Sequence, residues 1–430
     1  MSGIVANAFW VVYFFPPLAM GSKPRETGWC PVTPKYQLTN RFQRIVCIRV
    51  YGYDCSIWLL VGAPKAQTSQ PNVTAGGAVY RCGLESTTIC APVPFDLTGP
   101  TPSDIGRGQY KDDKSHQWFG ATVEASGENG LVVACAPRYV SFSINYQRRE
   151  PVGTCWIAKN SFSTFDEYSP CRTSQWGFHR QGYCQAGMSA ALAQDGKRLF
   201  VGAPGSWYWQ GQIYSKDLIT NDERKTRESP ASEDDSFLGY SSAAGEFTGD
   251  KSMDVVVGMP RGNNLTGKVV VYSSLLRNLQ NITGEQMGSY FGHSVCVADV
   301  NGDGLDDIVV GAPLFTDLLS KESKYEEGRV YVHYQDNKHY FDPEGRSVLD
   351  GTYTKGRFGL ALASLKDMNR DGYEDFAVGA PYAGKDGKGI IYIYHGSADG
   401  VRDKPSQTCD QVIKATTNRV LAGGMGCSRL

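Results

Sequence analysis

Six short apolar runs recur along the chain, and each closes on a small residue or methionine followed by proline. They are Trp58-Leu-Leu-Val-Gly-Ala-Pro64, Leu131-Val-Val-Ala-Cys-Ala-Pro137, Leu199-Phe-Val-Gly-Ala-Pro204, Val255-Val-Val-Gly-Met-Pro260, Ile308-Val-Val-Gly-Ala-Pro313 and Phe376-Ala-Val-Gly-Ala-Pro381. Runs of this length suit buried strands, and proline cannot donate to a ladder, so each is predicted to be a core strand that ends at its proline. Their spacing of roughly 50 to 75 residues indicates a repeat fold.

Each run lies inside a unit with the same internal order. An aromatic-glycine segment precedes four of them: Trp118-Phe-Gly120, Phe237-Leu-Gly-Tyr240, Tyr290-Phe-Gly292 and Phe358-Gly359. A glycine and a further strand follow, as in Gly77-Ala-Val-Tyr80, Gly211-Gln-Ile-Tyr214, Gly267-Lys-Val-Val-Val-Tyr272, Gly328-Arg-Val-Tyr-Val332 and Gly389-Ile-Ile-Tyr-Ile-Tyr394. Three or four short strands per unit are typical of a propeller blade. The predicted fold is an all-β propeller at 58–407 with about six blades, between atypical segments at 1–57 and 408–430.

Three turns that lead into these runs are unusually acidic. Oxygen-bearing side chains stand at positions one, three, five and nine, and position seven offers its backbone carbonyl. The expected ligands are Glu246, Thr248, Asp250, Ser252 and Asp254 in the first loop, Asp299, Asn301, Asp303, Leu305 and Asp307 in the second, and Asp367, Asn369, Asp371, Tyr373 and Asp375 in the third. Such oxygens repel one another unless a hard cation lies between them, and Mg²⁺ needs a tighter octahedron, so Ca²⁺ is the expected cofactor.

The alternative for each loop is an ordinary solvated Asp/Asn/Gly turn. Recurrence at the same place in consecutive units favours the metal, and the bound ion is expected to clamp a hairpin. The pattern is not an EF-hand, because the last acid stands at position nine and strands flank the loop. The first loop departs most, since Lys251 replaces a glycine there, resists a positive φ and adds a positive charge near the ion.

The cysteines and glycosylation sequons indicate an extracellular protein. Twelve cysteines are present without C-x-x-C or zinc-type spacing. Three close pairs, Cys82/Cys90, Cys135/Cys155 and Cys171/Cys184, each close a short loop, as structural disulfides do in an oxidising compartment. Sequons at Asn72, Asn264 and Asn281 add three predicted glycosylation sites.

Charge and motifs exclude several other classes of protein. The 430 residues carry a formal net charge of −1, so no global field favours nucleic acid or an acidic membrane. The apolar stretch at 4–20 fits a secretory leader in length, but it lacks a basic start and contains Pro16-Pro17, so both readings stay open. No later stretch reaches the ~18 apolar residues of a membrane span. Without Gly-x-Ser-x-Gly, His-Glu-x-x-His or a phosphate-binding loop, an enzyme is not expected.

The tandem order of Phe-Gly, D-x-N-x-D-G-x-x-D and Val-Gly-Ala-Pro resembles the FG-GAP repeats of integrin α subunits, over about residues 58–406. Further matching segments are Gly77-Ala-Val-Tyr-Arg-Cys82, His116-Gln-Trp-Phe-Gly120, Arg149-Glu-Pro-Val-Gly-Thr-Cys155 and Gly205-Ser-Trp-Tyr-Trp-Gln-Gly211. They most resemble the branch that lacks an I domain and recognises Arg-Gly-Asp ligands, and within it the insect position-specific type 2 group. The resemblance implies a seven-bladed adhesion-receptor head that pairs with a β subunit and binds extracellular-matrix ligands.

The resemblance also implies a surface for the β subunit. Aromatic side chains at the starts of the inner strands, namely Trp118, Tyr240, Tyr290, Phe291 and Phe358, would form a cage around a basic residue of that partner. A cation over desolvated rings gains ~1–2 kcal/mol. The alternative is that these rings only pack the central channel.

A second implied surface reads the arginine of the ligand. Tyr208, Trp209 and Asp234 match the aromatic segment and one acid of the family, and a carboxylate can bind a guanidinium through two hydrogen bonds. The loop between Cys171 and Cys184 holds no carboxylate, and His179 stands where some relatives keep Asp. Arginine capture is therefore expected to be weaker or to use Trp176, and the alternative for Asp234 is a plain exposed acid.

Both ends depart from the family pattern. Only Tyr51-Gly-Tyr53 resembles a first-blade start, and 408–430 contains no seventh metal loop and no final Val-Gly-Ala-Pro. A truncated form, at the cell surface or secreted, is expected, and a non-signalling decoy fragment is the alternative to a receptor head.

Overall fold

The structure is a computed structural model that describes residues 58–83, 90–101, 112–126, 130–142, 148–319 and 324–410, with short strands at 10–11, 44–46, 415–416, 419–420 and 426–429. Apart from 10–11, the possible leader at 4–20 lies outside the described residues, as does Tyr51-Gly-Tyr53. No helix within the described ranges is long and apolar enough to cross a bilayer.

The described residues form six sheets of four or five strands and two sheets of two strands. The first large sheet carries an additional edge strand, β1 (Trp10–Val11), which runs parallel to β2 (Arg44–Val46), and β2 is counted as the first strand of this blade. In the other five, the first strands are β6 (Thr122–Ala125), β12 (Ser189–Leu192), β16 (Ser241–Gly245), β20 (Ser294–Ala298) and β24 (Ala361–Lys366). The all-β propeller predicted from the sequence is confirmed.

The second strand of each sheet coincides with one of the six apolar runs. These are β3 (Trp58–Ala63), β7 (Val132–Ala136), β13 (Arg198–Ala203), β17 (Asp254–Met259), β21 (Asp307–Ala312) and β25 (Asp375–Ala380). Every residue of β7, β17 and β21 is buried. Because these strands have a neighbour on each side and a neighbouring blade on each face, a continuous apolar run replaces the alternation of a half-exposed strand.

The third strands are β4 (Ala78–Gly83), β10 (Thr154–Lys159), β14 (Gln212–Asp217), β18 (Lys268–Tyr272), β22 (Arg329–Gln335) and β26 (Ile390–Tyr394). The outer strands are β5 (Cys90–Pro92), β11 (Thr164–Tyr168), β15 (Glu223–Lys225), β19 (Asn278–Thr283), β23 (Phe341–Asp350) and β27 (Gln407–Asp410). Within the sheets all these neighbours pair antiparallel, as in β16–β17 and β17–β18.

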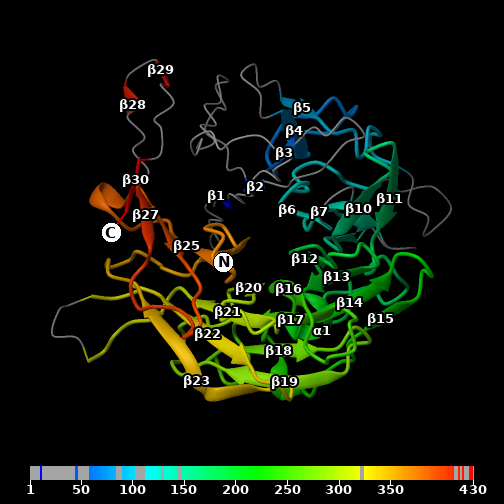
Figure 1. Ribbon diagram of the computed structural model, residues 1–430. Coiled ribbons are helices and arrows are strands. Elements are labelled where there is room, and N and C mark those ends of the chain that lie inside the picture. The colour runs from blue at the N-terminus through cyan, green and yellow to red at the C-terminus, as the bar shows by residue number, and fades with distance from the viewer. Residues whose placement is uncertain are drawn as a thin grey trace, which may run out of the picture.

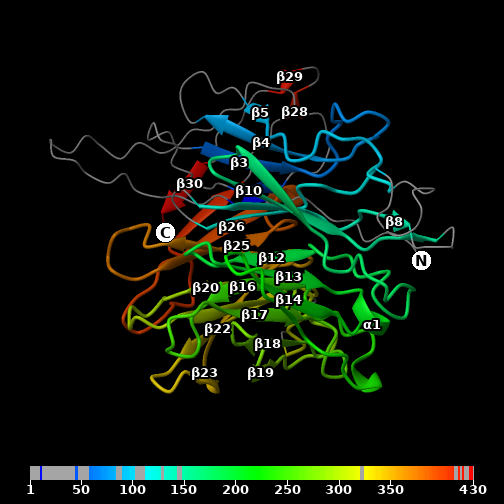
Figure 2. The same cartoon turned by 90° about the vertical axis from the view of Figure 1, so that its right-hand side faces the viewer.

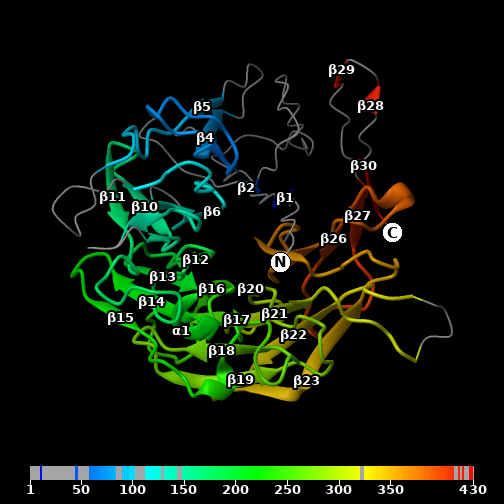
Figure 3. The ribbon, with the colours of Figure 1, turned by 180° about the vertical axis from the view of Figure 1, so that it is seen from behind.

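The six sheets are arranged around a common centre as the blades of a propeller. Inner strands such as β12, β16 and β20 lie toward the middle, and outer strands such as β15, β19 and β23 lie at the rim (Figure 1). The same order is seen from behind (Figure 3). Consecutive sheets in the sequence are consecutive blades in space, so each blade packs mainly on the blades before and after it.

Connecting segments add short elements at the ends of the blades. They are α1 (Ser206–Trp209), the 3₁₀ turns Ala231–Glu233 and Lys385–Gly387, and the hairpin of β8 (Ser141–Phe142) with β9 (Arg149–Glu150). Seen from the side, α1 and β8 lie toward the same end of the propeller (Figure 2). This end carries the loops considered below as a ligand surface.

The first and last sheets reach beyond the predicted limits of the propeller. On the N-terminal side, β2 pairs with β3 and therefore belongs to the first blade. On the C-terminal side, β27 ends at Asp410 and pairs with β30 (Gly426–Arg429), while β28 (Ala415–Thr416) and β29 (Arg419–Val420) form a separate pair. The sequence pattern missed these strands because none of them carries the apolar run that ends at proline in the repeats.

Glycines make the joints between neighbouring blades. Isolated parallel bridges join Gly77 to Phe119, Gly153 to Ala186, Gly211 to Leu238 and Gly267 to Phe291. At Gly267, φ is +78°, and a Cβ atom would lie 2.4 Å from the carbonyl oxygen of Phe291. A side chain there would meet fixed backbone of the next blade, so the close approach requires glycine.

Gly267→Ala is expected to lower the free energy of unfolding by about 3 kcal/mol, from a strained positive φ and from overpacking at the joint. Urea denaturation measures this loss. The matched control is Gly288→Ala, where φ is +79° and nothing lies within 4 Å of the added Cβ, so only the backbone strain of about 1 kcal/mol is expected. Equal losses in the two variants would show that the joint accepts a side chain.

Candidate functional site

The three acidic loops occupy the same place in consecutive blades. They connect β16 to β17, β20 to β21 and β24 to β25, and the ninth residue of each is the first residue of the second strand: Asp254, Asp307 and Asp375. The loops share a backbone form as well, because the residues at positions four and six have positive φ in all three. The sequence pattern therefore corresponds to one repeated turn.

In the second loop, the side chains at positions one, three and five gather around the loop backbone. Asp299 Oδ1 and Asn301 Oδ1 both accept from the backbone N–H of Asp303, at 3.1 and 3.2 Å. Asn301 Nδ2 in turn donates to Asp303 Oδ2 at 3.0 Å. Three hard-oxygen side chains are thus brought side by side.

The third loop repeats this arrangement. Asp367 Oδ1 and Asn369 Oδ1 both accept from the backbone N–H of Asp371 at 3.1 Å, and Asn369 Nδ2 donates to Asp371 Oδ2 at 2.8 Å. Asn369 Nδ2 also lies 2.9 Å from the Nδ1 atom of His395. The two loops that match the motif best therefore have the same internal geometry.

The carboxylate at position nine joins its loop to the end of the third strand of the blade or to the residues just after it. Asp307 accepts from the backbone N–H groups of Val300 and Gln335, at 3.1 and 3.0 Å. Asp375 accepts in the same way from Met368 and Gly396, at 2.9 and 3.1 Å. Both oxygens of each carboxylate are thereby engaged by backbone.

Burial disfavours the ionised form of the carboxylate at position nine. It raises the pKa of Asp307 to about 8, and the Asp303 and Asp299 carboxylates add to the rise against the two backbone hydrogen bonds. Burial likewise raises the pKa of Asp254 to about 6. A cation held in the loop would favour the ionised form, so the residues present fit a hard divalent ion.

Across the described residues, however, no group of three or more His, Cys, Asp or Glu side chains is arranged to hold a metal ion. The donor set of the second and third loops mixes carboxylate, amide and carbonyl oxygens, which are the ligands that Ca²⁺ takes. The metal-ligand assignments stay predictions.

The first loop differs in its internal contacts. Glu246 Oε1 accepts from the backbone of Thr248, Gly249 and Asp250, at 3.1, 2.6 and 3.1 Å, and Thr248 Oγ1 donates to Asp254 Oδ2 at 3.0 Å. Lys251 adopts a φ of +65°, so the turn forms despite the side chain that was expected to resist it. The positive charge of Lys251 remains the difference from the other two loops.

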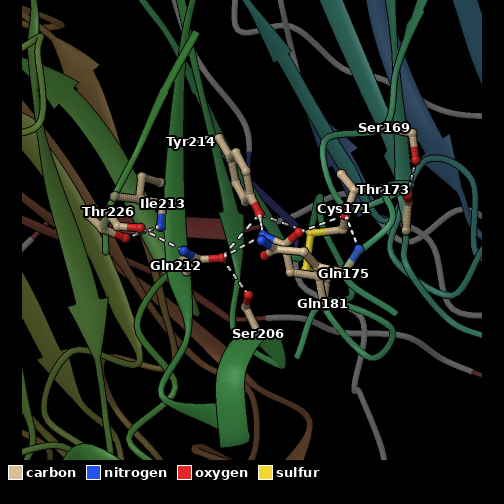
Figure 4. The surroundings of a disulfide bond; sticks show 12 residues. Ser169, Cys171, Thr173, Gln175, Gln181, Ser206, Gln212, Ile213, Tyr214 and Thr226 are labelled. Atoms are coloured by element: carbon tan, nitrogen blue, oxygen red, sulfur yellow. Dashed lines mark hydrogen bonds between the residues drawn. A yellow bond between two sulfur atoms is a disulfide. The ribbon is translucent and has the colours of Figure 1, made fainter. Parts of the chain in front are cut away.

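A second constellation centres on the Cys171–Cys184 loop. A network of buried polar side chains fastens this loop to β14 and α1 (Figure 4). Gln181 Nε2 donates to Tyr214 Oη at 2.7 Å and to Gln212 Oε1 at 3.1 Å. Ser206 Oγ also donates to Gln212 Oε1, at 2.6 Å. Because these groups are buried and mutually satisfied, the loop is held in one position.

This network places rings from two segments together, and all of them except the half-buried Trp209 are exposed. The ring of His179 stacks on that of Tyr208 with centroids 4.8 Å apart, and Phe178 lies 6.5 Å from Trp209. Tyr183 meets Trp209 at 6.4 Å. Phe178 and Tyr183 were not singled out from the sequence, although their place inside a short disulfide loop was the signal available.

The segment that carries Asp234 lies beside these rings. The backbone N–H of Asp235 donates to the carbonyl of Tyr208 at 3.1 Å. Asp234 is exposed, and its Oδ1 accepts from Gln210 Nε2 at 2.7 Å. The structure thus brings together the segments that carry all four predicted ligand-binding residues. We call the surface formed by Phe178, His179, Tyr183, Tyr208, Trp209 and Asp234 the aromatic face.

Trp176 is engaged differently. The guanidinium of Arg148 lies 4.6 Å from the centroid of its ring. The indole therefore already stacks on a cation of this chain, rather than standing open for one from a ligand.

For two of the five residues predicted for the β-subunit cage, the prediction is wrong. Phe291 and Phe358 are only 1% and 2% exposed, and they pack inside their blades against Tyr331 and Tyr392, at 5.1 and 5.2 Å. The residue directly before the glycine of each aromatic-glycine segment points into the core, so it is unavailable to a partner.

The other three cage residues are partly exposed, and two of them meet. Tyr240 and Tyr290 lie 5.9 Å apart, and His293 lies 5.2 Å from Tyr240. The guanidinium of Arg138 lies over Trp118 at 4.8 Å. Phe237, which occupies the same place as Trp118 relative to its glycine, was missed although the repeat marks it.

The structure contains the three disulfides predicted from the sequence, Cys82–Cys90, Cys135–Cys155 and Cys171–Cys184. The three sequon asparagines, Asn72, Asn264 and Asn281, are exposed. Attachment of a glycan requires this exposure, and the modification itself stays a prediction.

Comparison with known proteins gives the family of this propeller. The model of the FG-GAP repeat matches residues 291–333 and 358–394, and that of the FG-GAP-like repeat matches 246–310. The chain is 48% identical to integrin alpha-PS2 of Drosophila melanogaster, over 87% of this chain and 29% of that protein. Over its propeller, the chain is homologous to integrin α subunits and carries FG-GAP repeats.

Other relatives are integrin alpha-8 of Homo sapiens, with 47% identity over 82% of this chain and 35% of that protein, and integrin alpha pat-2 of Caenorhabditis elegans, with 42% identity over 81% and 30%. The integrin α-type chain thus spans about a third of the length of these relatives. Integrin α subunits are receptors, so the expectation that the chain is not an enzyme agrees with its family. Among solved structures, the Dos1 propeller gives a TM-score of 0.46 at 11% identity, over 86% of this chain and 73% of that chain, which is too distant to add to this result.

Without metal, the stability of the integrin α-type propeller is expected to fall as the pH rises. Folded Asp307 stays protonated up to about pH 8, whereas the unfolded carboxyl ionises near 3.8. Its stabilising contribution is therefore complete below 3.8 and is lost as the pH rises through 8, by up to about 1.4 kcal/mol per pH unit.

Urea denaturation in a chelator, at several pH values between about 5 and 7, tests this dependence. Asp307→Asn should flatten the slope, and Asp195→Asn, in an exposed turn of the third blade, should leave it unchanged. The same slope in the wild type and Asp307→Asn would contradict the assignment.

Proposed function

We propose that this chain is the ligand-binding head of an integrin-type adhesion receptor, which pairs with a β subunit and binds an extracellular-matrix protein at the cell surface. The single observation that carries the proposal is the aromatic face. Three segments far apart in the sequence contribute exposed rings and an acid to it, and a buried network holds the Cys171–Cys184 loop in place. An exposed aromatic cluster on a rigid support is typical of a protein-binding surface.

The chemistry of the aromatic face suits an arginine-bearing ligand. Tyr208 would offer the face of its ring that His179 does not cover, and Asp234 keeps an oxygen available beside the one that accepts from Gln210. A guanidinium between them gains a charge-assisted hydrogen bond and a cation–π contact. With His179 in place of a second acid, the ligand arginine meets one carboxylate, so binding is expected to be weaker than with two.

The β subunit would approach the mouth of the central channel. Tyr240, Tyr290 and Trp118 remain candidates for its basic residue, and Phe237 and His293 join them from the structure. Phe291 and Phe358 are excluded by their burial.

Calcium would occupy the second and third loops, and the first loop more weakly. Asp299, Asn301 and Asp303, with their counterparts in the third loop, would hold the ion, which supplies positive charge beside their carboxylates. In the first loop, Lys251 opposes this by its own charge. The expected role is structural.

Calcium is expected to stabilise the propeller by about 2.7 kcal/mol per loop, at a concentration a hundredfold above the dissociation constant. Asp303→Asn and Asp371→Asn should each remove most of one loop's share. The matched control is Asp195→Asn, which alters an acid in the equivalent turn of the third blade, between β12 and β13. Thermal unfolding with and without Ca²⁺ measures the difference, and an equal calcium effect in all three variants would refute the assignment.

Tyr208→Ala and Asp234→Asn are each expected to weaken binding to an immobilised Arg-Gly-Asp ligand about tenfold, because each removes one contact to the guanidinium. The measurement is surface plasmon resonance on the chain co-expressed with an integrin β-subunit ectodomain. Asp235→Asn controls for a neighbouring charge, and Tyr340→Ala controls for loss of an exposed tyrosine on another blade.

Two results would count against the proposal. Failure to form a Ca²⁺-dependent heterodimer would leave a secreted fragment without a partner. A heterodimer that binds ligand equally well with all four variants would place the ligand surface elsewhere.

A further inference from the structure

The acidic loops are joined to one another by their eighth residues. In the second loop, Oδ2 of Asp306 accepts from the backbone N–H of Glu246 at 2.7 Å. Glu246 is the first residue of the first loop, in the preceding blade. Asp306 is not among the ligand positions of its own loop, so its carboxylate serves the neighbouring loop.

The third loop reaches back to the second in the same way. Glu374 Oε2 accepts from the backbone N–H of Asp299 at 3.3 Å, and the backbone N–H of Glu374 donates to the carbonyl of Asp299 at 2.9 Å. Lys366 holds the Glu374 carboxylate through bonds of 2.9 and 3.1 Å. The first residue of each earlier loop is therefore fastened on its backbone by the eighth residue of the next.

The first loop lacks such an acid, and it has no acidic loop behind it. Its eighth residue is Met253, and the corresponding turn of the third blade reads Ala193-Gln-Asp-Gly-Lys-Arg198. An acid at position eight thus occurs where there is a preceding acidic loop to hold. Acids that only face solvent would not be expected to occur in this pattern.

Other side chains strengthen both junctions. Gln335 Nε2 donates to the carbonyl of Glu246 at 3.0 Å and to that of Asp306 at 2.8 Å. At the next junction, the ring of Tyr373 lies on Gly302, where an added Cβ would be 2.7 Å from Cδ1 of the tyrosine. The first and second loops are therefore each covered on one side by the blade that follows.

We propose that the calcium affinity of an acidic loop depends on the blade that follows it, with Asp306 and Glu374 as positioning residues for the first ligand of the loop before them. The inference rests on the proposed calcium sites. A first ligand whose backbone is already held loses less conformational freedom when the ion binds, so its loop binds more tightly. Because coupling is reciprocal, an ion in the earlier loop also favours the hold by the later one.

The test measures Ca²⁺ binding at the second loop after residues of the third loop are changed. The full chain carries Asp371→Asn to disable the third loop, and Ca²⁺ binding is measured by isothermal titration with Glu374 intact, as Gln or as Ala. Glu374→Ala is expected to weaken the affinity of the second loop about five- to tenfold. Glu374→Gln, which keeps an acceptor oxygen, should weaken it less.

Both substitutions remove the negative charge that pairs with Lys366. The difference in Ca²⁺ affinity between them therefore reports the acceptor oxygen at position 374 and not the charge. Asp386→Asn, which removes a negative charge from the same blade outside the loops, is the control and should leave the affinity unchanged. The parallel test disables the second loop with Asp303→Asn and compares Asp306→Ala with Asp306→Asn for binding in the first.

A second measurement guards against variants that fold poorly. Hydrogen exchange of the 299–307 amides in Ca²⁺-saturated protein should speed up in Glu374→Ala while exchange in β17 stays unchanged. If the wild type binds Ca²⁺ and the Ala and Gln variants have equal affinity for it, the coupling is overturned and the calcium sites stand. If the wild type binds no Ca²⁺, both proposals fall together.

Discussion

The contact between blades depends on a close approach of backbone to backbone. At these joints a glycine at the start of a third strand meets the residue before a glycine of the next blade, which belongs to an aromatic-glycine segment in three of the four bridges. At Gly267 an added Cβ would lie 2.4 Å from a carbonyl oxygen. This approach directs the residue before each repeated glycine, such as Phe291, into the core. It also brings the turns of successive blades close enough to bond. The repeat of glycine and aromatic residue is thus a consequence of packing one sheet against the next.

The same junctions also bring negatively charged side chains together. The acidic loops concentrate carboxylates at one end of three consecutive blades, and Asp307 is buried there with a pKa of about 8. Backbone amides satisfy these carboxylates in hydrogen-bonding terms, but amides supply no net charge. A hard cation completes the balance, and the reach of Asp306 and Glu374 into the loop before them makes that balance a property of neighbouring blades.

The aromatic face is held in place in a different way. Here a disulfide and a set of buried glutamine, serine and tyrosine side chains hold a loop that has little secondary structure. Since Gln181, Gln212 and Tyr214 satisfy one another away from solvent, the rings of His179 and Tyr208 can be exposed without the loop becoming loose. An exposed binding surface and a rigid support are compatible because buried hydrogen bonds beneath it hold the loop.

Local pattern determined much of this protein. The six apolar runs gave their strands, and the cysteine pairs gave their disulfides, because both depend on residues close together in the chain. The spacing of acids likewise predicted one repeated turn. Tertiary packing alone decided that Tyr290 is partly exposed while the adjacent Phe291 is buried, since the strand that covers Phe291 belongs to the same blade about forty residues further on. It alone joined His179, Tyr208 and Asp234 into one face and bonded Glu246 to Asp306, because contacts between distant residues arise only when the blades close on one another.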